Sequence, residues 1–214
     1  MPRDPYTTPV GVPSQAPGDL TFEVPDLKQG ELRDIRRDRS VVDFALPMPV
    51  TLIRPLKRSR AHRGVAPRVS WGVEAVGAVG CPFTGDGIVV AVLDTGIDKG
   101  HAAFSGLELV KKNFTQEADE DVDGHGTHCA GTIFGRPVDD CTIGVAPGVR
   151  KALIGKVLGM EGGSSEAIFE AILWAFENHA QVVSMSIGID FPGYQRALVD
   201  RGYPCTTNLE SLVF

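Results

Sequence analysis

The stretch GIVVAVLDTGID, residues 87–98, decides the fold of this chain. It holds an unbroken run of six apolar residues at positions 88–93, which ends at the carboxylate of Asp94. A short, continuous apolar run with many β-branched residues is typical of a strand buried on both faces of a parallel sheet. We therefore predict a buried strand over residues 88–93, with Asp94 at its carboxyl end.

Further strand and helix patterns follow along the chain. The segments LIGKVL (153–158) and QVVSMSI (181–187) have the same apolar character and are predicted to be strands. Between them, Ser165 is expected to cap a helix. The apolar stripe of that helix is Ile168, Ala171, Ile172, Ala175 and Phe176. This alternation predicts an α/β fold with a three-layer, doubly wound parallel sheet, whose functional residues gather at the carboxyl ends of strands.

The region before this domain has a different composition. Residues 1–20 are rich in proline and small polar residues and are expected to be disordered. A short charged helix should follow, and then an extended stretch at 40–53 whose prolines favour an edge strand. A basic linker covers residues 59–69, and the α/β domain occupies 70–214.

Composition and charge exclude several classes of function. Of the 214 residues, 43% are hydrophobic and 22% are charged, as in ordinary soluble globular proteins. Residues 1–70 carry 12 Lys and Arg against 8 Asp and Glu, whereas the remainder carries 9 against 19. We expect no nucleic-acid binding, because no basic stripe with interleaved aromatic residues is present. No apolar run is long enough to span a membrane and no secretory signal is visible, so a cytoplasmic location is the default expectation.

The four cysteines show no metal-finger spacing and are expected to be free thiols.

A second motif, DVDGHGTHCAGT at residues 121–132, places two histidines among glycines. A carboxylate at the end of a buried strand loses hydration and needs a partner, and an imidazole Nδ1–H is a suitable donor. The glycines beside His125 let a helix start approach that strand, so His125 can pair with Asp94. Simple packing and a zinc site remain alternatives. The zinc site would use His125, His128 and Asp123, although HExxH motifs space their histidines four residues apart rather than three.

The segments VVAVLDTGID and GHGTHCAGT resemble the aspartate and histidine signatures of the subtilisin-like serine proteases, in the order that this family uses. The cysteine in HGTHC is most similar to the proteinase K branch. The resemblance implies that Asp94 is the orienting carboxylate and His125 the general base of a catalytic triad. It also implies that His128 is a helix residue behind the site, and that no metal takes part in catalysis.

The resemblance extends from about residue 71 to residue 188 and includes two walls of a substrate cleft. It implies that an extended peptide or protein substrate binds between them as an added β-strand. The residues implied for one wall are Gly162, Gly163 and Ser164, and those for the other are Ser186, Ile187 and Gly188.

The segment at 21–58 resembles the later half of a subtilase propeptide, and a plain N-terminal extension is the alternative interpretation. The resemblance implies that the chain's own N-terminal segment acts as an intramolecular inhibitor. No cofactor is expected. Many subtilases bind calcium, and the acidic run at 119–124 is a candidate for such a site, although a solvated acidic loop is the favoured interpretation.

Two features of the family are missing from these 214 residues. Subtilases need a nucleophilic serine in a Gly-Thr-Ser-Met-Ala context and an asparagine for the oxyanion hole, and neither is present. Loss of the nucleophile alone costs about six orders of magnitude in turnover. We therefore expect an incomplete peptidase domain that is inactive alone and exposes an aggregation-prone sheet edge. Two alternative functions remain: a non-catalytic peptide-binding pseudoprotease, and a zinc hydrolase that would use the alternative zinc site described above.

Overall fold

The computed structural model describes residues 32–35, 37–41, 47–53 and 68–200. The chain divides into two compact units, one up to Ala45 and one from Leu46 onward. The first contains the short helix α1 (Leu32–Ile35), which agrees with the predicted charged helix. The predicted disorder of residues 1–20 lies outside the described residues, as does nearly all of the basic linker at 59–69.

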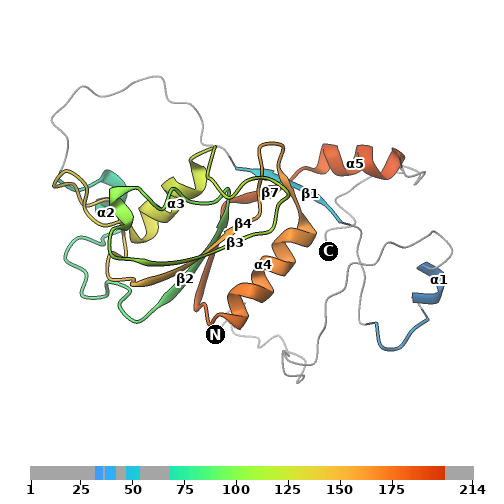
Figure 1. Cartoon of the computed structure of the whole chain (residues 1–214), viewed down its shortest axis with the longest axis horizontal. Coiled ribbons are helices and arrows are strands. Elements are labelled where there is room, and N and C mark those ends of the chain that lie inside the picture. The colour runs from blue at the N-terminus through green and yellow to red at the C-terminus, as the bar shows by residue number, and fades with distance from the viewer. Residues whose placement is uncertain (1–31, 36, 42–46, 54–67, 201–214) are drawn as a thin grey trace, which may run out of the picture. The chain divides into compact units, whose positions relative to one another are not determined.

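The second unit is built on a four-stranded parallel sheet in the order β3-β4-β2-β6 (Figure 1). Its strands are β2 (Val89–Asp94), β3 (Glu108–Asn113), β4 (Lys151–Lys156) and β6 (Val182–Met185). The strands predicted around 88–93, 153–158 and 181–187 are confirmed. Strand β3 was not predicted, because it lies at the sheet edge and carries charged residues instead of an apolar run.

In the part of this unit that the structure describes, five short or medium helices accompany the strands. They are α2 (Trp71–Ala75), the 3-10 helix η2 (Ala102–Phe104), α3 (His125–Phe134), α4 (Ser165–Glu177) and α5 (Phe191–Asp200). None of the helices in the described ranges is long and apolar enough to cross a bilayer.

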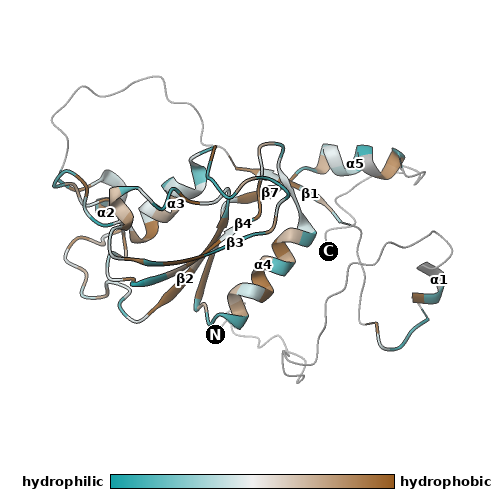
Figure 2. Ribbon diagram, in the orientation of Figure 1, coloured by the Kyte–Doolittle hydropathy of each residue, from teal (hydrophilic) through white to brown (hydrophobic). Residues whose placement is uncertain are grey.

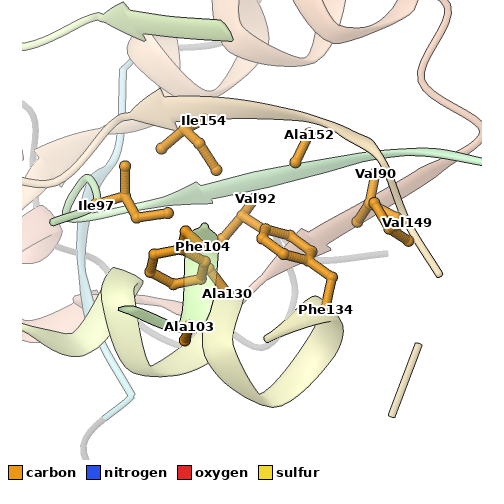
Figure 3. Close-up of a cluster of buried hydrophobic side chains, with 10 residues drawn as sticks. All are labelled: Val90, Val92, Ile97, Ala103, Phe104, Ala130, Phe134, Val149, Ala152 and Ile154. Atoms are coloured by element: carbon orange, nitrogen blue, oxygen red, sulfur yellow. The ribbon is translucent and has the colours of Figure 1, made fainter. Parts of the chain in front are cut away.

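Alternate residues of β2 point to opposite faces of the sheet, where α3 and the short helix η2 cover one face and α4 covers the other. Val92 packs in a cluster with Phe134 of α3, as the close-up in Figure 3 shows. Leu93 instead packs with Ala171 of α4. Helix, sheet and helix therefore form three layers around the apolar central strands (Figure 2), as a strand buried on both faces requires.

Two details of α4 differ from the prediction. The residue that caps the helix is Ser164, whose Oγ accepts a hydrogen bond from the amide of Ala167 at 3.3 Å. Ser165 is already helical, and its Oγ accepts from the amide of Met48 at 2.9 Å. Phe176 is 63% exposed, so the buried stripe ends at Ala175.

A second, three-stranded antiparallel sheet has the order β5-β1-β7. Its strands are β1 (Pro49–Leu52), β5 (Gly163–Ser164) and β7 (Ile187–Ile189). The prediction that prolines confine the 40–53 stretch to an edge is wrong, because β1 is the central strand. Pro49 is tolerated there because it is the first residue of the strand, where a missing N–H interrupts no ladder.

Candidate active site

The structure brings Asp94 and His125 together at the carboxyl end of β2. Oδ1 of Asp94 lies 2.8 Å from Nδ1 of His125 and also accepts a hydrogen bond from the amide of Thr95 at 2.8 Å. Asp94 is 1% exposed, while the His125 side chain is 16% exposed. A buried carboxylate that accepts the Nδ1 proton leaves Nε2 free to accept a second proton, which is the arrangement of a general base.

Two glycines put His125 in this position. Gly124 precedes helix α3 with a φ of 83°, a left-handed conformation that glycine adopts without strain. Gly126 follows His125 and faces the backbone of Gly96, where a Cβ would lie 2.2 Å from the carbonyl oxygen. The expectation that glycines let the helix start approach the strand is confirmed.

A thiol lies beside the imidazole. Sγ of Cys129, one turn further along α3, is 3.7 Å from Nδ1 of His125 and 3.7 Å from Oγ of Ser186. Burial raises the pKa of the Cys129 thiol, and the nearby carboxylates of Asp94 and Asp121 raise it further, while the Ser186 hydrogen bond opposes this. Because only the thiolate is a good nucleophile, Cys129 is not an activated nucleophile at neutral pH.

The three ligands of the alternative zinc site, His125, His128 and Asp123, do not form a metal-binding group in the described structure. Across the described residues, the one group of three potential ligand side chains within 4.8 Å of one another is Asp94, His125 and Cys129. His128 is exposed and is not a member of this group, and neither is Asp123.

The acidic run at 119–124 is not simply a solvated loop. Asp121 is half-buried and accepts hydrogen bonds from Thr95, Gly124 and Thr127. Sequence reasoning missed this residue as part of the site. An aspartate just before a helix start is a capping signal that could have identified it.

The two predicted cleft walls lie on either side of β1. Gly163 and Ser164 form β5, which pairs with β1 through Val50↔Gly163 and Pro49↔Ser164. Ile187 and Gly188 belong to β7, on the opposite side of β1. Gly162 directly precedes β5 and Ser186 directly precedes β7, where the Ser186 carbonyl accepts a hydrogen bond from the amide of Ile53 at 3.3 Å.

The strand between the walls directs its side chains alternately inward and outward. Val50 is 3% exposed and packs in the cluster that contains Leu93 and Leu158, while Leu52 packs against the same cluster. Thr51 is exposed. A Cβ on Gly163 would lie 2.3 Å from the carbonyl oxygen of Val157, so β5 accepts only glycine at this position.

Comparisons with known proteins agree with these motifs. The family model of the subtilase family matches residues 85–210. The chain is 43% identical over 112 residues to the major intracellular serine protease of Bacillus subtilis (strain 168), covering 49% of this chain and 35% of that protein. It is 34% identical over 146 residues to subtilisin-like protease 6 of Arthroderma benhamiae, covering 64% of this chain and 34% of that protein.

A solved structure is also similar. A psychrophilic subtilisin-like protease from an Antarctic Pseudoalteromonas species aligns with a TM-score of 0.49 and 27% identity, over 62% of this chain and 33% of that one. The chain spans about a third of the length of the curated relatives that it matches.

Proposed function

Because the chain belongs to the subtilase family, we propose that residues 70–214 are part of a subtilisin-like serine endopeptidase domain that acts on extended peptides. In this domain Asp94 is the orienting carboxylate and His125 the general base. The observation that carries the proposal is the 2.8 Å contact between Oδ1 of Asp94 and Nδ1 of His125. Nε2 of His125 would take the proton of a serine hydroxyl and later pass it to the leaving amine.

The proposed reaction needs a nucleophile that this sequence does not contain. No serine of the 214 residues stands in a Gly-Thr-Ser-Met-Ala context. The thiol of Cys129 does not replace it, because its raised pKa keeps it protonated at neutral pH. We therefore propose that these residues alone do not hydrolyse peptides.

The proposed substrate site is the space between β5 and β7. Its residues would be Gly162, Gly163 and Ser164 on one wall and Ser186, Ile187 and Gly188 on the other. The position of β1 supports this, because an extended segment already pairs with both walls through its backbone. Backbone pairing gives affinity and the alternate inward side chains give selectivity.

The N-terminal segment is proposed to be an intramolecular inhibitor, as part of a propeptide-like region at 21–58. Support comes from β1, which pairs with both proposed walls, and from Ile53 directly after it, whose amide donates to the carbonyl of Ser186. Two similar proteins, from Bacillus subtilis and Paenibacillus polymyxa, are named intracellular serine proteases, which supports a cytoplasmic location.

A hybrid enzyme tests the catalytic proposal. The part of this chain that aligns with the Bacillus subtilis major intracellular serine protease, 49% of its length, replaces the aligned segment of that protein, which supplies the remainder of the domain. We expect peptide hydrolysis that falls by about 10⁴-fold in Asp94→Asn, because the imidazole then loses its orientation. His128→Ala is the matched control and should retain activity, since His128 is exposed. A folded hybrid that is equally active with Asp94→Asn would contradict the proposal.

The alternative function is a non-catalytic peptide-binding module. The observation that favours it is the extended strand seated between the walls of a chain that lacks the nucleophile motif. A fluorophosphonate probe distinguishes the two, because it labels only an activated hydroxyl. Labelling of the hybrid enzyme that is lost in Asp94→Asn supports the peptidase, and peptide binding by the 214-residue chain with no labelling of the hybrid supports the module.

A further inference from the structure

We propose that Asp121 is a positioning residue that holds Asp94 and His125 in register for proton transfer. The inference rests on the proposed function of this pair. It concerns a residue outside the triad, which acts through Thr95 and the first turn of α3.

The carboxylate of Asp121 joins two elements that are distant in sequence. Oδ1 accepts hydrogen bonds from Oγ1 of Thr95 at 2.7 Å and from the amide of Gly124 at 2.9 Å. Oδ2 accepts from the amide of Thr127 at 2.8 Å and from its Oγ1 at 2.5 Å. One side chain therefore links the residue after β2 with the start of α3.

The link to Thr95 reaches Asp94 directly. The amide of Thr95 donates to Oδ1 of Asp94, which is the same oxygen that faces Nδ1 of His125. Oγ1 of Thr95 also accepts a hydrogen bond from the amide of Gly126 at 2.9 Å. Thr95 therefore contacts the carboxylate of Asp94, the start of α3 and the carboxylate of Asp121.

The link to α3 holds the backbone on both sides of His125. Gly124, immediately before it, donates to Asp121, and Gly126, immediately after it, donates to Thr95. The backbone at 124–126 is rich in glycine and has little conformational restraint of its own. The hydrogen bonds from Asp121 and Thr95 supply that restraint, so they fix where the imidazole lies.

The carboxylate is needed for its four acceptor sites and its charge. All four groups that contact it are donors, and an ionised carboxylate is the side chain that only accepts. An asparagine at position 121 would replace one of the two acceptor oxygens with an NH₂ group, which would then face two hydrogen-bond donors without being able to accept from them. A negative charge beside the first turn of α3 is also stabilised by the helix dipole.

The test compares Asp121→Asn with Glu120→Gln in the 214-residue chain. Glu120 is exposed and adjacent, so its substitution removes one charge from the same loop while leaving the network intact. The readout is the downfield proton resonance of the His125 Nδ1–H, measured by NMR with ¹⁵N-labelled histidine and assigned with His125→Ala. We expect the resonance in the parent and in Glu120→Gln, and its loss in Asp121→Asn. An unchanged resonance in folded Asp121→Asn overturns the inference.

A second pair of variants keeps the inference testable if Asp121→Asn does not fold. Thr95→Val removes the hydroxyl at nearly constant shape, and Thr95→Ser keeps it. We expect the resonance to be lost in Thr95→Val and retained in Thr95→Ser. Retention in both overturns the proposal. Absence of the resonance from the parent protein would instead count against the Asp94–His125 pair, and so against the proposed function.

The hybrid protease gives an independent kinetic readout. A positioning residue should lower kcat and leave KM nearly unchanged, because it acts on the base and not on substrate binding. We expect this split for Asp121→Asn and parent-like values for Glu120→Gln. A variant that raises KM alone would place Asp121 in substrate binding and overturn the inference.

Discussion

Gly126 lies directly against Gly96: a Cβ on Gly126 would be 2.2 Å from the carbonyl oxygen of Gly96 and 3.1 Å from its amide nitrogen. Both atoms belong to the backbone, so they cannot rotate away. The contact explains how the start of α3 comes near enough to β2 for His125 to reach Asp94.

The first prediction is that Gly126→Ala separates the helix start from the strand. We expect a loss of about 1–3 kcal/mol in the free energy of unfolding, measured with urea, and loss of the His125 Nδ1–H resonance. Gly131→Ala is the matched control in the same helix, because its Cβ would meet only Ile143 Cδ1, at 4.0 Å. The control should be neutral or stabilising. Equal destabilisation by both would contradict the close contact as the cause.

The second prediction concerns β1, the central strand of the antiparallel sheet. Val50→Asp places an unpaired carboxylate in an apolar cluster, which costs several kcal/mol and should release β1. Hydrogen exchange of the Ile53 amide should accelerate, because its bond to Ser186 is lost. Thr51→Asp introduces the same charge at the neighbouring exposed position and should leave the exchange rate near that of the parent. The same rate in both variants would show that burial of Val50 does not retain the strand.

The third prediction is a pH dependence of Cys129 alkylation. Burial, with a contribution from Asp94 and Asp121, raises the pKa of this thiol, so less thiolate is present at any given pH. Alkylation by iodoacetamide should therefore be slow at neutral pH and increase at pH values above the ordinary thiol range. Mass spectrometry of the labelled peptides can follow it beside the exposed Cys81. Labelling of Cys129 as fast as Cys81 at pH 7 would contradict the prediction.

The fourth prediction is an acid sensitivity that depends on Asp121. Burial opposes its ionisation, but the hydrogen bonds from Thr127, Thr95 and Gly124 outweigh burial and lower its pKa. A lowered pKa gives stability that is present above the unfolded value, about 3.9, and is lost as the pH falls through the folded value. The parent should therefore be more stable than Asp121→Asn near neutral pH, and the difference should shrink below about pH 4. Urea unfolding of both proteins from neutral pH to below about pH 4 measures the difference in their free energies of unfolding. A constant difference would contradict the mechanism.

The fifth prediction concerns the exposed edge of the parallel sheet. Among the described strands β6 lies at the edge of this sheet, and Val182, Val183 and Met185 are 48%, 38% and 47% exposed. Val182→Lys should reduce light scattering of concentrated protein, because a charge on an edge strand opposes intermolecular strand pairing. Val199→Lys, on helix α5 and 51% exposed, adds the same charge away from the edge. An equal reduction by both would point to net charge and not to the edge.

The central strands and their helices could be predicted from local sequence, because burial on both faces demands long apolar runs. Strand β2 is the clearest case. Strand β3 escaped detection because an edge strand keeps one side in solvent and carries Glu108, Lys111 and Lys112. Strand β6, at the opposite edge of the described sheet, could be predicted because its residues are mostly apolar, so the charged residues of β3 are what hid that strand.

Parts of the site depend on contacts that no local pattern contains. The central place of β1 results from pairing between Val50 and both Gly163 and Ile189, more than a hundred residues later. The role of Asp121 depends on Thr95, which lies 26 residues earlier and becomes a neighbour only in the folded chain. The Asp94–His125 pair was predictable because each residue lies in a distinctive motif.

The pairing of β1 with both β5 and β7, the two walls of the proposed substrate site, has a consequence for any measurement of peptide binding. A covalently attached occupant competes at an effective concentration that can reach millimolar for short connections. A free peptide must exceed that local concentration before it occupies half of the sites. Under the proposed function, affinities measured on the intact chain should therefore be weaker than the intrinsic affinity of the proposed substrate site, and the difference between them measures how tightly the tethered strand is held.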